Sequence, residues 1–337
     1  MSDIKVISRI MKTLIVLLLL TPALSIAKIY NGTLVDAHSQ VGPLISNEQL
    51  SKQINNNDVD LTLLSIRGKW GSATQRYLSI QKLTKKKTKY LIPTKLGGFT
   101  RKETDNSKAI RTIKYLRDQA LNYNIDYVGF GEIIVQHAPH DHSKLKYEGI
   151  NLDFKSERIN KAIDIVLSDK KPVILHVELN DYEEDSKKIL SQLIDLAKKN
   201  PSENFLLMHM AQIEISEAKY LLNNTNNIHF ITSHADNERK RQMKRNPGKG
   251  QMGWINLFDK NDNLQKRWLD LMNKNPKRFV LALDNVWDGH WLRGYATRVF
   301  IWRKALSSLD KQAALLIACG NANYYFKLDI KCLEERP

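Results

Sequence analysis

Short apolar runs alternate with amphipathic stretches along most of the chain, and the runs predict strands because each is bounded by polar, Gly or Pro residues. Eight strands are expected: Leu34–His38, Leu61–Ile66, Thr88–Ile92, Tyr127–Glu132, Pro172–His176, Phe205–His209, Ile228–Thr232 and Phe279–Asp284. Apolar residues at a spacing of three and four predict helices after several of them. These helices are Lys108–Tyr123, Ile159–Leu167, Glu183–Lys199, Ile215–Leu222, Leu264–Asn273, Ala296–Leu306 and Lys311–Ala318.

Alternation of this kind predicts parallel strands joined by right-handed crossovers. The length of the chain suits a (β/α)8 TIM barrel, since such barrels typically have about 250 residues and often more. We therefore expect a single α/β barrel domain with long loops after strands four and seven. A doubly wound open sheet is the alternative, but no Gly-rich dinucleotide fingerprint follows the first strand.

Residues 1–27 have the layout of a secretory signal peptide. The segment contains basic residues, an apolar run and a small-residue cleavage site, in the order Lys5, Arg9, Lys12, then Leu14–Leu20, then Ser25-Ile26-Ala27. The run is short for a transmembrane helix, although an uncleaved anchor is the alternative. We expect residues 28–337 to form a secreted barrel, periplasmic in a Gram-negative cell, with no stable membrane span after cleavage.

The chain is basic, with a formal net charge of +16 that falls to about +14 without residues 1–27. This charge is either solvated or attracts anionic substrates or envelope surfaces. No nucleic-acid-binding pattern is present, so nucleic acid is not an expected partner. Two cysteines do not form a disulfide framework; Cys319 and Cys332 either pair with each other or Cys319 belongs to the core.

Four of the predicted strands end in side chains that can bind a metal ion. They are His38 and Gln40 after strand one, His176 after strand five, His209 after strand six and Asp284 after strand eight. Alternate residues of a strand point to the same face, so Asp36 is expected to share the space of His38 and Gln40. Because the active site of a parallel barrel collects the C-terminal ends of its strands, we expect one common site there.

In order and spacing, these motifs resemble those of the amidohydrolase superfamily, specifically the amidohydrolase-related metal-dependent hydrolases with a TIM-barrel fold. The resemblance runs from about Leu34 to about Phe326. It is carried by Val35-Asp36-Ala37-His38-Ser39-Gln40, Pro172-Val173-Ile174-Leu175-His176, Phe205-Leu206-Leu207-Met208-His209-Met210-Ala211, Arg278-Phe279-Val280-Leu281-Ala282-Leu283-Asp284 and Gly320-Asn321-Ala322.

The resemblance implies a hydrolase that cleaves a lactone, ester or amide of a small, anionic substrate, or less commonly decarboxylates a small acid. The implied metal ligands are His38, Gln40, His176, His209 and Asp284, and the implied cofactor is one divalent ion: zinc, manganese or iron. Such an ion lowers the pKa of bound water to roughly 7. Asp284 is the implied general base, and His209 the implied ligand or oxyanion hydrogen-bond donor.

Gln40 departs from the Asp-x-His-x-His pattern of the family, which has a second histidine at this position. An amide oxygen is a poorer zinc ligand than an imidazole. Three readings therefore stay open: a one-metal enzyme, a metal-free lactonase, and a catalytically silent envelope protein that binds a ligand on the same barrel.

Further polar residues follow the predicted strands. Glu132, in Gly129-Phe130-Gly131-Glu132, is a candidate metal ligand or a carboxylate that orients one. Glu178, His234 and Arg239 are candidate substrate contacts. Arg239 belongs to the basic segment Glu238–Lys249, which is either a solvated loop or a lid that attracts an anion.

Two more groups have a structural and a functional interpretation. Trp254, Trp287 and Trp291 could wall a pocket or pack in the core. A histidine-rich loop follows strand four, and we expect it at the surface or the rim of the site, not as a dedicated metal site; its residues are His137, His140, Asp141 and His142.

Overall fold

The computed structural model describes residues 29–67, 72–94, 106–142, 145–147, 149–179, 183–233 and 255–336. Several predictions fall outside these ranges, namely the signal peptide, the basic segment, His234, Arg239 and Trp254. No helix among the described residues is long and apolar enough to cross a membrane.

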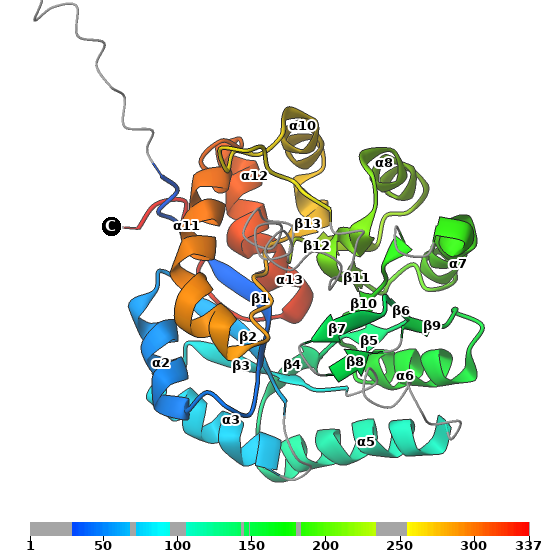
Figure 1. The fold of residues 1–337 in the computed structure, drawn as a ribbon, viewed down its shortest axis with the longest axis horizontal. Helices are drawn as coiled ribbons and strands as arrows, with labels where there is room; N and C mark the ends of the chain where they lie inside the picture. Colours follow the sequence, from blue (N-terminus) through cyan, green and yellow to red (C-terminus); the bar gives the residue numbers. More distant parts are fainter. Residues whose placement is uncertain are drawn as a thin grey trace, which may run out of the picture.

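Strands and helices alternate along the chain, and the helices surround the strands (Figure 1). The strands of the two main sheets are β1 (Val35–Val41), β2 (Leu61–Ile66), β3 (Thr88–Ile92), β4 (Tyr127–Phe130), β5 (Ile133–Ile134), β10 (Val173–His176), β11 (Phe205–Leu207), β12 (Ile228–Ile231) and β13 (Phe279–Val280). The main α-helices are α2 (Asn47–Asn56), α3 (Ser72–Leu83), α5 (Asn106–Asn122), α6 (Glu157–Ser168), α7 (Glu183–Lys199), α8 (Ile215–Asn224), α10 (Lys266–Lys274), α11 (Tyr295–Leu306), α12 (Lys311–Leu315) and α13 (Asn321–Phe326).

The strands form two parallel sheets, in the orders β1-β2-β3-β4 and β13-β12-β11-β10-β5. The sheets are connected at both edges. At one edge β4 continues into β5, and at the other the amide of Ala37 donates to Leu281 O (3.0 Å) and that of Asp284 to His38 O (2.9 Å). This arrangement of parallel strands inside a layer of helices confirms the predicted α/β fold of the TIM-barrel type.

Two helices of the first half, α2 and α3, were not among the predicted elements. Helix α2 is mostly polar and buries only Leu50, Ser51 and Ile54, so its apolar spacing is too sparse to stand out. Its start is nevertheless well defined, because Ser46 and Gln49 form a reciprocal capping box. The loop expected after strand four also contains short strands: β6 (Gln136–His137), β7 (His140–His142), β8 (Leu145–Tyr147) and β9 (Ile150–Asn151).

The strands are buried on both faces, as is usual for parallel sheets covered by helices. All six residues of β2 are buried. Leu61 and Leu63 pack in the barrel interior, whereas Leu64 and Ile66 pack against the helices. Helix α13 adds Phe326 to the interior cluster. This packed interior is the rigid base that holds the strand ends.

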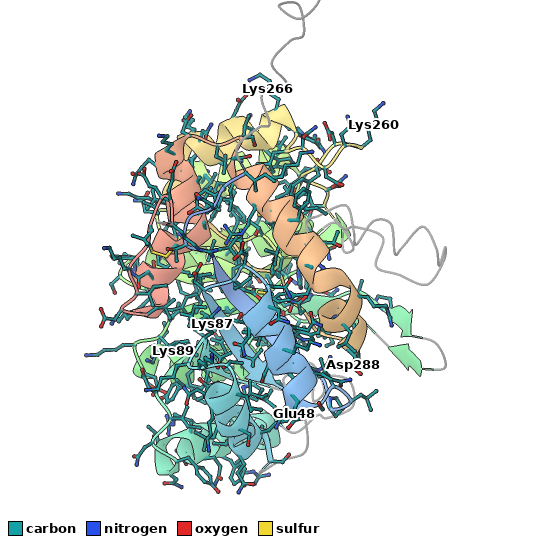
Figure 2. All side chains as sticks on the ribbon, turned by 90° about the vertical axis from the view of Figure 1, so that its left-hand side faces the viewer. Glu48, Lys87, Lys89, Lys260, Lys266 and Asp288 are labelled. Atoms are coloured by element: carbon teal, nitrogen blue, oxygen red, sulfur yellow. A yellow bond between two sulfur atoms is a disulfide. The ribbon has the colours of Figure 1, made fainter. Side chains whose placement is uncertain are left out.

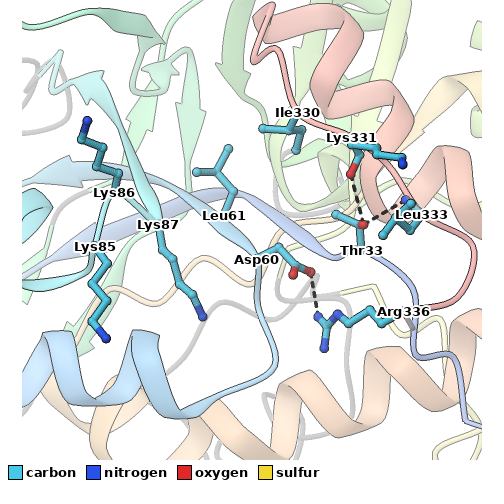
Figure 3. Close-up of a pocket in the computed structure, with 10 residues that line it drawn as sticks. All are labelled: Thr33, Asp60, Leu61, Lys85, Lys86, Lys87, Ile330, Lys331, Leu333 and Arg336. Atoms are coloured by element: carbon cyan, nitrogen blue, oxygen red, sulfur yellow. Dashed lines mark hydrogen bonds and ion pairs between the residues drawn. The ribbon is translucent and has the colours of Figure 1, made fainter.

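The C-terminal segment is bound beside the N-terminal ends of β1 and β2. Cys319 and Cys332 form a disulfide, and the guanidinium of Arg336 binds Asp58 and Asp60, each at 2.7 Å. Beside this segment lies a largely basic pocket (Figure 3). Its polar lining residues are Thr33, Asp60, Lys85, Lys86, Lys87, Lys331 and Arg336.

Loss of the disulfide is expected to lower the free energy of unfolding by about 3 kcal/mol, because a cross-link over a loop of roughly this length restricts the unfolded chain. The cysteines are 13 positions apart. The variant Cys319→Ala/Cys332→Ser should be compared with the wild type by urea unfolding, and the wild type in reducing buffer should unfold like the variant. Equal stability of all three would contradict this prediction.

Charged side chains of both signs project from the outer surface, as Figure 2 shows for Lys87, Lys260, Lys266, Glu48 and Asp288. Lys266 on α10 pairs with Asp270 at 3.0 Å although both are exposed. Such exposed pairs contribute little to stability. The charges of this pair are therefore largely solvated.

Acid is expected to destabilise the fold through His229 on β12. Burial, together with the charge of Arg278, lowers the pKa of His229 to about 3. The unfolded chain takes up this proton below about pH 6.5 and the folded chain does not, so stability is complete above pH 6.5 and falls as the pH decreases toward 3. At pH 5 the loss is about 2 kcal/mol.

Urea unfolding at pH 7 and pH 5 measures this effect, with His229→Gln as the comparison. The variant should be less stable at both pH values, because the ring of His229 packs against Tyr325 with centroids 4.2 Å apart. Its decrease in stability from pH 7 to pH 5 should be about 2 kcal/mol smaller than that of the wild type. Equal decreases would show that His229 does not carry the effect.

Candidate metal-binding active site

A β-bulge in β1 sets the direction of the first site residues. The register of β1 against β2 shifts between Asp36 and Ser39, which breaks the regular alternation of side chains. Asp36 therefore does not join the cluster expected for it. Its carboxylate accepts hydrogen bonds from Ser39 Oγ (2.5 Å) and the amide of Leu283 (2.8 Å), and burial raises its pKa to about 7 despite these bonds.

His38 and Gln40 do reach the common site. The Nδ1 atom of His38 lies 3.1 Å from Asp284 Oδ1, while its Nε2 atom is buried and has no hydrogen-bond partner among the residues that the structure describes. The side-chain nitrogen of Gln40 donates to Glu132 Oε1 at 3.1 Å and to Asp284 Oδ1 at 3.5 Å. Gln40 thus directs its amide nitrogen toward the carboxylates, not the oxygen that was expected to bind a metal ion.

Glu132 occupies the break between β4 and β5. Gly131 before it packs tightly, since a Cβ atom there would lie 3.3 Å from Ser65 Oγ, and its amide donates to Ile92 O. Thr94 Oγ1 binds the carbonyl of Glu132 at 2.6 Å. The close backbone packing at this break places the Glu132 carboxylate between Gln40 and His176.

His176, the last residue of β10, lies between two carboxylates. Its Nδ1 atom is 2.7 Å from Glu132 Oε2 and its Nε2 atom is 2.7 Å from Glu178 Oε1. Burial opposes the charged ring, but the negative charges and hydrogen bonds of Glu132 and Glu178 outweigh it and raise the pKa of His176 to about 10. Glu178 is fully buried and also accepts the amide of Ala138. Glu178 therefore holds the ring of His176 through Nε2, the nitrogen that does not contact Glu132.

His209 lies just beyond β11, in a turn that differs from the predicted strand. The strand ends at Leu207, and His209, Met210 and Ala211 have φ values of 54°, 56° and 51°. Left-handed backbone is costly for residues with a Cβ and often accompanies functional sites. Ser233 Oγ lies 3.0 Å from His209 Nδ1, so His209 presents Nε2 to the cluster.

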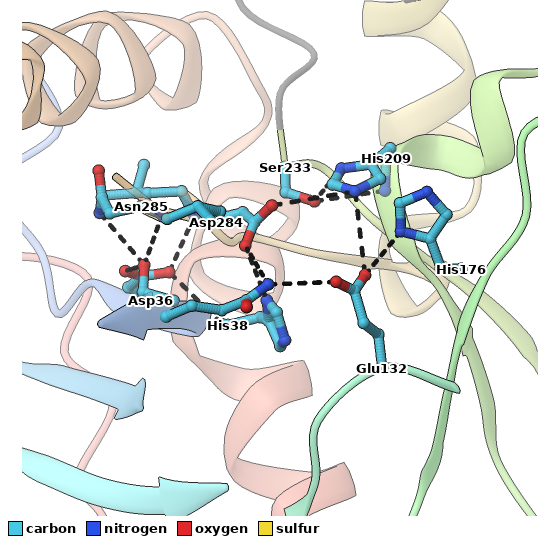
Figure 4. Close-up of polar contacts among 12 residues, drawn as sticks. Asp36, His38, Glu132, His176, His209, Ser233, Asp284 and Asn285 are labelled. Carbon is cyan, nitrogen blue, oxygen red and sulfur yellow. Dashed lines mark hydrogen bonds and ion pairs between the residues drawn. The ribbon is translucent and has the colours of Figure 1, made fainter. Parts of the chain in front are cut away.

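Asp284 completes the cluster from the segment after β13. Its φ is 45°, and regular β13 ends at Val280, so the predicted strand Phe279–Asp284 is shorter than expected. Asp284 Oδ2 lies 3.9 Å from His209 Nε2, and Glu132 Oε2 lies 4.0 Å from the same nitrogen. Figure 4 shows the carboxylates of Asp284 and Glu132 turned toward each other, with His209 and His176 close by.

The donor atoms of this cluster fit a divalent cation. Ligand atoms of Glu132, His176 and His209 all lie within 4.8 Å of one another. Ligands bonded to one zinc at about 2.0–2.2 Å are roughly 3–4 Å apart, which matches the separations around His209 Nε2. Nitrogen and carboxylate ligands suit zinc, manganese and iron, and the contact of His176 Nε2 with Glu178 is the carboxylate support usual for a metal-binding histidine.

The remaining predicted residues have other positions. His137, at the edge of the site, stacks on His176 with ring centroids 4.9 Å apart, and His137, His176 and Glu178 form a second group of candidate ligands. Trp291 is buried and donates its indole N–H to Gln40 O at 2.9 Å. Trp287 is partly exposed beside Arg67. Ser233 was not predicted; its only signal was its place after a predicted strand.

No family model and no curated protein sequence matches the chain. Several solved structures match the chain in fold. A dihydroorotase matches with a TM-score of 0.53 at 10% identity, over 89% of this chain and 73% of that protein. A mutant organophosphorus hydrolase from Deinococcus radiodurans matches with a TM-score of 0.50 at 10% identity, over 89% and 94% of the two chains.

A dihydropyrimidinase from Brevibacillus agri matches with a TM-score of 0.50 at 9% identity, over 92% of this chain and 75% of that protein. At such low identity the likeness concerns the fold, and function has to be argued from the site. The chain therefore shares the fold of a dihydroorotase, an organophosphorus hydrolase and a dihydropyrimidinase.

Proposed function

We propose that the protein is a metal-dependent hydrolase of the amidohydrolase type, which cleaves a C–O or C–N bond in a small, anionic lactone, ester or amide. The observation that carries this proposal is the convergence of Glu132, His176, His209 and Asp284 at the C-terminal ends of the strands. Two imidazoles and two carboxylates at this end of a barrel form an arrangement suited to metal-assisted hydrolysis.

The residues of the cluster and its neighbours have three proposed roles: metal binding, proton transfer and the positioning of the other side chains. Glu132, His176 and His209 would hold a divalent cation, which when bound polarises a carbonyl and lowers the pKa of water. Asp284 accepts the proton of the attacking water and returns it to the leaving group. His38 Nδ1 hydrogen-bonds Asp284 Oδ1 and so keeps the carboxylate in place, while Glu178 fixes the ring of His176.

Burial and charge support the substrate class. His38, His176, His209 and Asp284 are at most 3% exposed, so only a small reacting group can approach them. The net charge, about +14 without residues 1–27, favours the approach of an anion. The layout of residues 1–27 and the Cys319–Cys332 disulfide support a secreted, periplasmic location, because disulfides persist in oxidising compartments.

Elemental analysis of the purified mature protein tests the proposal, together with a screen of lactones, esters and amides. We expect bound zinc, manganese or iron in the wild type, its loss from a His176→Ala/His209→Ala variant, and turnover that a chelator abolishes. Turnover that survives chelation but is lost in Asp284→Asn would establish a metal-free lactonase instead. Neither metal nor turnover would favour a ligand-binding protein.

A further inference from the structure

The side chain of Gln40 lies between the two carboxylates of the site, those of Glu132 and Asp284. Its side-chain nitrogen donates to Glu132 Oε1 and to Asp284 Oδ1, at 3.1 and 3.5 Å. Ionised carboxylates only accept hydrogen bonds, so this environment requires the NH2 group of the amide, not its oxygen, to face them. One oxygen of each carboxylate is thereby engaged on the side of Gln40.

The second oxygen of each carboxylate, Glu132 Oε2 and Asp284 Oδ2, lies near the histidines of the site. Glu132 Oε2 lies 2.7 Å from His176 Nδ1 and 4.0 Å from His209 Nε2, and Asp284 Oδ2 lies 3.9 Å from His209 Nε2. The ligand atoms of Glu132, His176 and His209 all lie within 4.8 Å of one another and form one position for a cation, with Asp284 beside His209. The first oxygen of each carboxylate instead meets the N–H donor of Gln40, and that of Asp284 also meets the imidazole of His38. A cation cannot occupy the place of an N–H hydrogen.

The backbone holds Gln40 in this position. Its amide donates to Asn285 O at 2.7 Å, and its carbonyl accepts the indole N–H of Trp291 at 2.9 Å. The two bonds fix β1 against the segment that carries Asp284. The backbone of Gln40 is therefore held beside the segment that carries Asp284, from which its side chain reaches both carboxylates.

We propose that Gln40 makes this a one-metal site, because its amide spans Glu132 and Asp284 where a second cation would have to share them. This inference rests on the proposed function and deepens it. The cation is held on the side of His176 and His209, and Gln40 is a positioning residue that supplies two neutral hydrogen bonds in place of a second positive charge.

Metal counting on the full mature chain tests the inference. The protein is stripped with a chelator, loaded with excess zinc, desalted and analysed for zinc per chain. The wild type should retain one zinc. Gln40→His and Gln40→Glu each replace the donor by a ligand and should retain two. Gln312→His, on the exposed surface of α12, adds a histidine far from the cluster and should retain one.

The outcomes separate the inference from the proposed function. Two zinc ions in the wild type would overturn the inference and leave a metal-dependent enzyme. No zinc in the wild type would overturn the proposed function. A single zinc in both Gln40 variants would show that Gln40 does not exclude the second ion. Manganese-loaded wild type provides an independent readout: an isolated-ion paramagnetic resonance spectrum is expected, and an exchange-coupled pair would overturn the inference.

Discussion

Replacement of Asp284 by asparagine is expected to lower kcat by about 10³- to 10⁴-fold on whichever lactone, ester or amide the wild type cleaves. A positioned general base contributes rate factors up to about this size. Asparagine keeps the volume of Asp284 and can still accept a hydrogen bond from His38 Nδ1, but it cannot take a proton from water. Steady-state kinetics over a range of pH measures the effect.

The same variant should retain most of its zinc, because Glu132, His176 and His209 are unchanged. This separates the loss of a base from the loss of a metal. Asp288→Asn is the matched control, since Asp288 lies four positions further along the chain and on the outer surface (Figure 2), and its kcat should equal that of the wild type. An Asp284→Asn variant with kcat within tenfold of the wild type would assign the base to another residue.

The location of the site could be predicted from the sequence because it depends on one general property of barrels. Strands in parallel order bring their C-terminal ends to one face, so His38, His176, His209 and Asp284 could be grouped although 246 positions separate the first from the last. The prediction required only that apolar runs end at these residues. No knowledge of loop shape was needed.

The directions of individual side chains could not be predicted in this way. Asp36 was expected beside His38, but the bulge between Asp36 and Ser39 turns it toward Leu283. The left-handed turn at His209 contains no glycine that would have marked it. Asp36 contacts Leu283 and His209 contacts Ser233, so both features involve contacts between segments far apart in sequence, which strand periodicity does not encode.

The orientation of the Gln40 amide could not be predicted from the sequence either. Its type and position suggested a weak oxygen ligand, but Glu132, 92 positions away, turns the nitrogen toward the carboxylates. Ser233 illustrates the converse case, since its place after a strand assigns it no role until His209 Nδ1 is found 3.0 Å from its hydroxyl.

The variant His176→Ala is expected to lose its metal and part of its stability together. His176 is a ligand in the proposed site and also lies between Glu132 and Glu178. Removal of one partner from a buried charged pair typically costs about 3–5 kcal/mol, because the remaining charge is uncompensated. Zinc titration by calorimetry and urea unfolding in the presence of a chelator measure the two losses separately.

A second variant separates the two roles of His176. Glu178 is fully buried, so the double variant His176→Ala/Glu178→Gln removes one of the two uncompensated charges and should recover part of the lost stability. It should not recover zinc binding, because Glu178 supports the ligand without belonging to the cluster of Glu132, His176 and His209. If the single variant bound zinc with wild-type affinity, His176 would be structural and the cation would have to be held elsewhere. If the double variant bound zinc while the single did not, charge balance at Glu178 would control the site more than the imidazole ligand does.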